Sequence, residues 1–108
     1  MSAPCLDLSK DLWGELWISL VSLLRSYCAA HGLHSGLQAT FELDEDRIIA
    51  RYRDRCLELD RSGAAVTWKR EDGSSGTLQL TEAGRLLGPA GEDEMDMAAE
   101  AWARELMK

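Results

Sequence analysis

The sequence lacks long apolar runs, has few aromatic residues and contains only three cysteines. No stretch approaches the roughly 20 apolar residues that a membrane span requires, so no membrane association is expected. Aromatic residues make up 6% of the 108 residues. The cysteines, at positions 5, 28 and 56, are odd in number and widely spaced, which argues against a disulfide framework. The acidic N-terminus also lacks the order of a signal peptide, and we therefore expect a cytoplasmic protein.

Positive charge is scarce as well. The chain has 12 Lys and Arg against 19 Asp and Glu, a formal net charge of −7. A protein that binds nucleic acid mainly through its phosphates needs a basic surface, so this balance argues against such a partner. Only residues 47–85 carry an excess of bases, eight against six acids. Within them we expect Arg47, Arg51 and Arg53 to point outward, and Arg47 and Arg51 to pair with acids on neighbouring strands.

The motifs of common catalytic sites are missing. The chain has no Gly-x-Ser-x-Gly, no phosphate loop and no dinucleotide fingerprint. Cys28, His31 and His34 have a spacing that could suit zinc, but Cys28 faces the expected core, and we interpret all three as structural. The sequence therefore assigns no catalytic residue, metal site or cofactor, and it leaves open whether the protein is an enzyme.

A first helix is predicted from Leu8 to His31, where apolar residues recur at helical spacing. Its apolar arc covers nearly half of the circumference, which is wider than a helix needs to cover a sheet. The polar side of this helix is interrupted only by Ile18. One flank, formed by Leu12, Leu16 and Leu23, is the candidate interface with a second chain.

Short alternating runs between residues 36 and 87 predict consecutive antiparallel hairpins. Opposite residues must point to the same face of a sheet, which allows the register to be tested. The pairs that keep one face apolar are Leu43 with Ile48, Phe41 with Ala50, Ala50 with Leu57, Ile48 with Leu59, Leu57 with Val66, Trp68 with Leu78, Val66 with Leu80, and Leu80 with Leu86. The first strand is expected at an edge of the sheet, with Gln38, Thr40 and Glu42 facing out and no Lys or Pro to block pairing.

The stretch from Asp46 to Ser62 also permits a helical interpretation, in which Ile48, Ile49, Tyr52, Cys56 and Leu59 share a face. Residues Leu80 to Leu87, LTEAGRLL, support a related alternative. This segment resembles the one that follows the wing in winged-helix transcription regulators. The resemblance covers about eight residues and implies a DNA-binding protein whose recognition helix is Asp46–Ser62. The clean alternation over residues 36–44 favours the strands instead.

A second helix is predicted from Glu92 to Lys108, with acids in its first turn as the helix dipole prefers. The sequence therefore predicts one α+β domain over residues 1–108. Its architecture is a single antiparallel β-meander of five to six strands, flanked by an N-terminal and a C-terminal helix that pack on one face.

Three functions are compatible with these features. The first is a non-enzymatic protein-binding or accessory domain, chaperone-like and acting as a homodimer, which the acidic balance and the broad apolar helix face favour. The second is a small-molecule binder or simple enzyme with a pocket between helix and sheet. That pocket would be lined by the four tryptophans, Trp13, Trp17, Trp68 and Trp102. The third is the winged-helix regulator.

Overall fold

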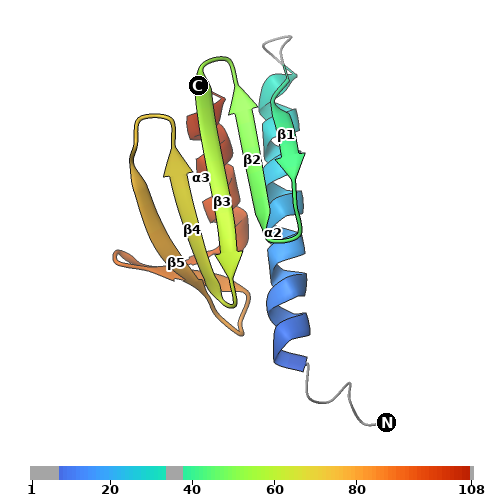
Figure 1. Ribbon diagram of the computed structural model, residues 1–108, viewed down its shortest axis with the longest axis vertical. Helices are drawn as coiled ribbons and strands as arrows, with labels where there is room; N and C mark the ends of the chain where they lie inside the picture. Colours follow the sequence, from blue (N-terminus) through green and yellow to red (C-terminus); the bar gives the residue numbers. More distant parts are fainter. Residues whose placement is uncertain (1–7, 34–37, 108) are drawn as a thin grey trace.

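The computed structural model describes residues 8–33 and 38–107, with the side chains of the first helix from Leu12 onward. In these ranges two helices lie against a single sheet (Figure 1). The elements in chain order are α2 (Leu8–Gly32), β1 (Thr40–Leu43), β2 (Arg47–Tyr52), β3 (Arg55–Ser62), β4 (Ala65–Arg70), β5 (Ser75–Leu80), β6 (Arg85–Gly88), β7 (Gly91–Glu94) and α3 (Met95–Leu106).

The sheet is an antiparallel meander in which each strand pairs with its neighbours in the sequence, in the order β1 to β7. Both helices lie on the same face of this sheet, and the shorter α3 packs against the C-terminal part of α2 (Figure 1). The α+β class and the flanking helices are confirmed. The sheet has seven strands rather than the predicted five to six.

The seventh strand occupies residues that were predicted to begin the second helix. Gly91, with a φ of 126°, pairs with Gly88 and turns the chain back along β6. The acidic run Glu92–Glu94 is therefore extended, and the helix begins at Met95. The prediction of a helix start at Glu92 was wrong because the hairpin places these acids opposite β6, where Arg85 forms an ion pair with Glu92 (3.2 Å).

The predicted register holds across β1, β2 and β3 and shifts further along the sheet. Leu57 pairs with Arg70 instead of Val66, because β3 continues to Ser62 before the chain turns at Gly63, which has a φ of 60°. Val66 pairs with Leu78 instead of Leu80. Both shifts are by an even number of residues, so the same side chains still face the helices. The pairing of Leu80 with Leu86 is confirmed.

Residues 46–62 contain β2, β3 and the turn between them. The helical interpretation of this stretch was therefore wrong, and the recognition helix that the winged-helix resemblance requires is missing from it. The short LTEAGRLL segment resembles the family only locally. It forms the end of β5, a turn and the beginning of β6, rather than a helix after a wing.

The core lies between the sheet and the two helices. Buried apolar side chains come from every second residue of the central strands and from one stripe of each helix, as periods of 2 and 3.6 require. They are Trp17, Leu20, Leu24 and Cys28 of α2; Ile48, Ala50, Tyr52, Leu57, Leu59, Val66, Leu80 and Leu86 of the sheet; and Ala99, Trp102, Ala103 and Leu106 of α3.

Candidate interaction surface

The leucine flank of α2 consists of Leu12, Leu16 and Leu23, of which Leu16 lies near Gly84 and Leu23 lies near the start of α3. All three side chains are half-buried, and Leu16 and Leu23 pack against the protein's own core. Leu23 also borders an open hollow that Gly84 and Met95 line. The structure thus places the predicted interface residues on one ridge, which this chain covers only in part.

The opposite flank of α2 carries Ile18, Ser22, Arg25 and Ala29, which share one face of the helix because they are four, seven and eleven residues apart. All are exposed, and 64% of Ile18 is accessible to solvent. This flank meets β1 at a shallow hollow, which Phe41 of β1 closes on one side. We call these four residues, with Phe41 and Leu43, the edge surface.

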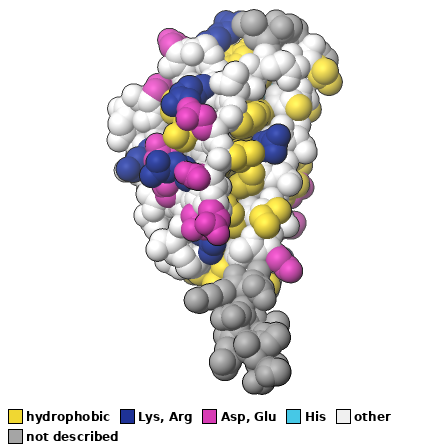
Figure 2. All heavy atoms as spheres, turned by 45° about the vertical axis from the view of Figure 1, so that its right-hand side comes forward, with side chains coloured by type: hydrophobic (Ala, Val, Ile, Leu, Met, Phe, Trp, Pro, Cys, Tyr) yellow, Lys and Arg dark blue, Asp and Glu magenta, His cyan; other side chains and the backbone are white. Residues whose placement is uncertain are grey.

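Figure 2 shows this side of the molecule, where hydrophobic side chains form a column with basic groups beside it. The guanidinium of Arg25 lies over the ring of Phe41, 5.7 Å from its centroid. No described carboxylate forms an ion pair with Arg25. An arginine that is stacked on an aromatic ring and lacks an anionic partner retains its capacity to bind a carboxylate.

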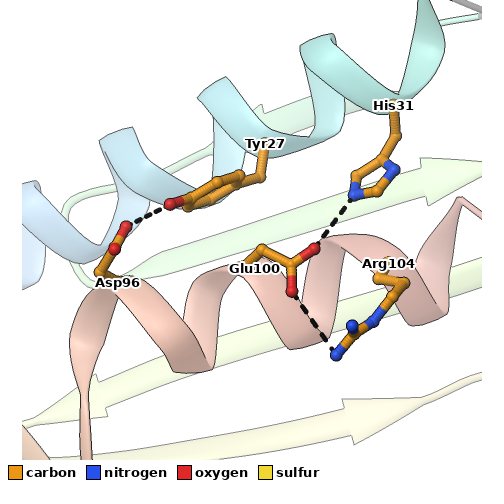
Figure 3. Close-up of polar contacts among 5 residues, drawn as sticks. All are labelled: Tyr27, His31, Asp96, Glu100 and Arg104. Carbon is orange, nitrogen blue, oxygen red and sulfur yellow. Dashed lines mark hydrogen bonds and ion pairs between the residues drawn. The ribbon is translucent and has the colours of Figure 1, made fainter.

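The orientation of α2 is fixed by polar contacts with α3 (Figure 3). Tyr27 donates a hydrogen bond to Asp96, and this bond raises the pKa of Tyr27 above its ordinary value. One turn further along, His31 Nε2 lies 3.4 Å from Glu100 Oε2, and Arg104 contacts the other oxygen of Glu100 at 3.5 Å. These contacts hold the helices together on the side away from the edge surface.

The outer face of the sheet pairs its charges internally. Arg47 binds Asp60 at 2.7 Å and approaches Glu58 at 3.7 Å, and Arg51 forms an ion pair with Glu42. Partial burial opposes ionisation of Asp60, but the hydrogen bond from Arg47 holds the pKa of Asp60 below its ordinary value. The predicted pairing of Arg47 and Arg51 with acids on neighbouring strands is confirmed.

The four tryptophans are placed at different points along the core. Trp17 and Trp102 are buried, whereas Trp13 and Trp68 are half-buried and pack against the edges of the core. A cavity of about 170 Å³ lies where β3 and β4 diverge, and Trp102 is the one tryptophan in its wall. The small-molecule alternative therefore stays a prediction.

Two polar groups in the wall of that cavity, the backbone N–H of Cys56 and the side chain of Arg55, form hydrogen bonds within the fold. Where β3 and β4 separate, the backbone N–H of Cys56 donates to Glu71 Oε1 at 2.9 Å in place of a strand partner. Arg55 donates to the carbonyl of Glu105 at 2.8 Å, in the last turn of α3. These bonds close the end of the fold around the cavity.

The spacing of Cys28, His31 and His34 could suit zinc, and part of this set lies outside the described residues. Cys28 is buried, and burial raises its pKa to about 11, whereas His31 is engaged with Glu100. His34 lies outside the described residues. Within the described ranges, no three or more His, Cys, Asp or Glu side chains gather in a way that would hold a metal ion.

Neither helix in the described part of the chain is both long enough and apolar enough to cross a membrane. Comparisons of the chain with protein-family models, curated proteins and solved structures give no match.

Sequence reasoning named one part of the edge surface and missed another. The free edge at β1 was predicted, but Ile18 was interpreted only as an interruption of the polar side of α2. Its spacing from Ala29, eleven residues, was the available signal for a second apolar flank.

Proposed function

We propose that the protein is a non-enzymatic, chaperone-like accessory domain that binds other proteins and acts as a homodimer. The observation that carries this proposal is that α2 presents more apolar surface than its own sheet and α3 cover. Its buried stripe forms the core, its leucine flank is half-covered, and Ile18 on the opposite flank is 64% exposed. Apolar surface of this kind on a helix is typical of contacts with another chain.

The chemistry-bearing side chains support a binding role, because their contacts within the fold are structural. Tyr27 and His31 join the two helices, and Arg47 and Arg51 pair with acids across the sheet. Cys28 and Cys56 are free thiols, which agrees with a reducing compartment, and we propose the cytoplasm. The net charge of −7 disfavours indiscriminate association of the apolar flanks.

For the homodimer we propose the leucine flank as the contact. Leu12 is half-buried at the start of the ridge, and Leu23 borders the hollow formed with Gly84 and Met95. A helix of a second copy would bury these side chains and fill the hollow. Because a two-fold axis makes the same patch serve both partners, a single substitution changes the interface twice.

The test is sedimentation equilibrium of the wild type and of Leu12→Asp over about 10 µM to 1 mM, concentrations suited to dimers of moderate affinity. We expect a dimeric mass for the wild type and at least a roughly tenfold weaker association for Leu12→Asp, because each dimer would bury two unpaired carboxylates. Met97→Asp is the matched control, since Met97 is an exposed apolar side chain on α3. A strictly monomeric wild type over this range would contradict the homodimer.

A further inference from the structure

Within the described residues no strand pairs with the outer edge of β1, to which Phe41 and Leu43 direct their backbone groups. The N–H of Asp44 donates to the carbonyl of Arg47 at 2.8 Å, and backbone groups along an antiparallel strand alternate between its two sides. Thr40 and Glu42 therefore direct their backbone groups to β2. Phe41 and Leu43, opposite Ala50 and Ile48, direct theirs away from the sheet. This edge has one open donor and one open acceptor at each of these two residues.

The opposite edge of the sheet is protected. β7 carries Glu92, Asp93 and Glu94 in succession, and all three are exposed. Charged side chains on an edge strand discourage pairing with a further strand. On β1 the only charge is Glu42, which points to the outer face and pairs with Arg51. Strand addition is therefore favoured at β1 over β7.

Beside β1, apolar side chains of α2 are available to contact the side chains of one more strand. Figure 1 shows α2 running behind β1, and the contact between Arg25 and Phe41 confirms that the two elements touch. On the flank beside β1, Ala29 lines the hollow with Phe41, Ile18 shares the same helix face, and both side chains are exposed. A strand added to β1 would place every second side chain over this flank.

A second copy that paired its own β1 with this edge would not fit well. Paired strands lie about 4.8 Å apart, whereas packed helices need about 8–10 Å between their axes. Since α2 runs behind β1 in each copy, pairing of the two β1 strands would bring the two α2 helices too close together (Figure 1). A single extended segment without a helix behind it has no such conflict.

We propose that the β1 edge binds an extended segment of a partner protein, which adds an eighth strand to the sheet. The side chains of this segment that face α2 are apolar, except for a carboxylate opposite Phe41, where it meets the unpaired guanidinium of Arg25. Backbone hydrogen bonds to Phe41 and Leu43 supply affinity, and Arg25 supplies the preference for an acidic residue. This inference names the partner chemistry of the proposed protein-binding function and rests on it.

The test uses the full chain and two synthetic peptides that differ at one position. The acidic probe is acetyl-Thr-Val-Thr-Glu-Thr-Val-Thr-amide, in which the two valines and the glutamate share one face, and the basic probe has lysine in place of glutamate. Titrations followed by ¹⁵N–¹H NMR report both affinity and location. We expect the acidic probe to bind more tightly, to shift the signals of β1 and α2, and to slow hydrogen exchange at Phe41 and Leu43.

Two substitutions separate the charge from the backbone contribution. Arg25→Glu should weaken the acidic probe by about tenfold and strengthen the basic one, because the ion pair becomes a like-charge contact. Leu43→Pro removes an outward N–H while leaving the bonds to β2, so it should weaken both probes. Leu43→Thr retains that N–H and is its matched control. Thermal unfolding of each variant checks that the fold is retained.

The outcomes separate this inference from the homodimer. Binding that maps to β1 and reverses its charge preference in Arg25→Glu supports the inference, even if sedimentation shows a monomer. No binding at millimolar peptide, binding located at another surface, or an unchanged preference in Arg25→Glu overturns it, even if the wild type is a dimer.

Discussion

Tyr27 of α2 donates its phenolic hydrogen to Asp96 of α3, which lies 69 residues further along the chain. The bond joins α2 to α3 next to the contact between His31 and Glu100 (Figure 3). It ties the long α2 to α3 from the side opposite the edge surface. The position of α2 behind β1 therefore depends in part on this pair.

Removing the hydroxyl should destabilise the protein without disturbing the packing of the ring. We expect Tyr27→Phe and Asp96→Ala, which remove the donor and the acceptor respectively, each to lower the midpoint of urea unfolding. In the double variant, the loss in the free energy of unfolding should be smaller than the sum of the two single losses, because both substitutions break the same bond. The measurement is a double-mutant cycle at pH 7. Fully additive losses would show that the bond contributes no coupling.

The same bond predicts a loss of stability in alkaline solution. Because the pKa of Tyr27 is raised in the folded state, its neutral form favours folding. This contribution is fully present below the ordinary tyrosine value of 10.0 and is lost as the pH rises through the raised value. We expect the difference between wild type and Tyr27→Phe in urea midpoint to be constant from pH 7 to 9 and to shrink at pH 11. A constant difference throughout would contradict the assignment.

Cys28 should be nearly inert toward thiol reagents in the native protein. Burial raises the pKa of Cys28 from 9.0 to about 11, so at pH 8 its thiolate population is roughly 100-fold lower than that of an ordinary thiol. In a Cys5→Ser background we expect Ellman's reagent to modify the half-buried Cys56 first and Cys28 only on unfolding. Adding Cys56→Ala should abolish the fast phase. Rapid native labelling of Cys28 would contradict its burial.

Gly76 is required because the ring of Trp68 lies on its backbone. A Cβ at this position would lie 2.7 Å from Nε1 of Trp68, so Gly76→Ala must displace a ring that packs against the core. We expect a loss of about 1–3 kcal/mol in the free energy of unfolding. Tryptophan fluorescence should shift as the ring moves.

Gly14→Ala is the matched control for that substitution. No atom lies within 4 Å of a Cβ at Gly14, which is inside α2. Alanine should stabilise the helix by about 0.5–1 kcal/mol. Equal effects of the two substitutions in urea unfolding would show that the contact with Trp68 is unimportant.

Much of the fold could be predicted because periodicity fixes which residues share a face. The alternation from Phe41 to Leu59 predicts the correct register for β1, β2 and β3. The same logic places Val66 and Leu80 on the helix-facing side despite the shifted pairings. The shifts themselves depend on where a turn closes. Gly63 allowed the turn after β3 to form later than the apolar pattern alone suggested.

The candidate site was less predictable because exposure depends on neighbours that are distant in sequence. Leu16 and Leu23 are apolar residues of the kind found in interfaces. They nevertheless pack partly against the core of the same chain, near Gly84 and Met95. Ile18 interrupts the polar side of α2, and its sequence context gives no sign that Arg25 and Ala29 on the same flank border a hollow with Phe41.

By itself, the sequence determined the element types up to β6 and most of the side chains that face inward, because these follow from repeat periods along the backbone. Only the tertiary structure decided that residues 91–94 form a seventh strand and that Arg25 stacks on Phe41 beside an open edge. Both features lie at the edges of the sheet, at β7 and at β1. The position of these edges depends on how the sheet and the helices pack together rather than on any local sequence pattern.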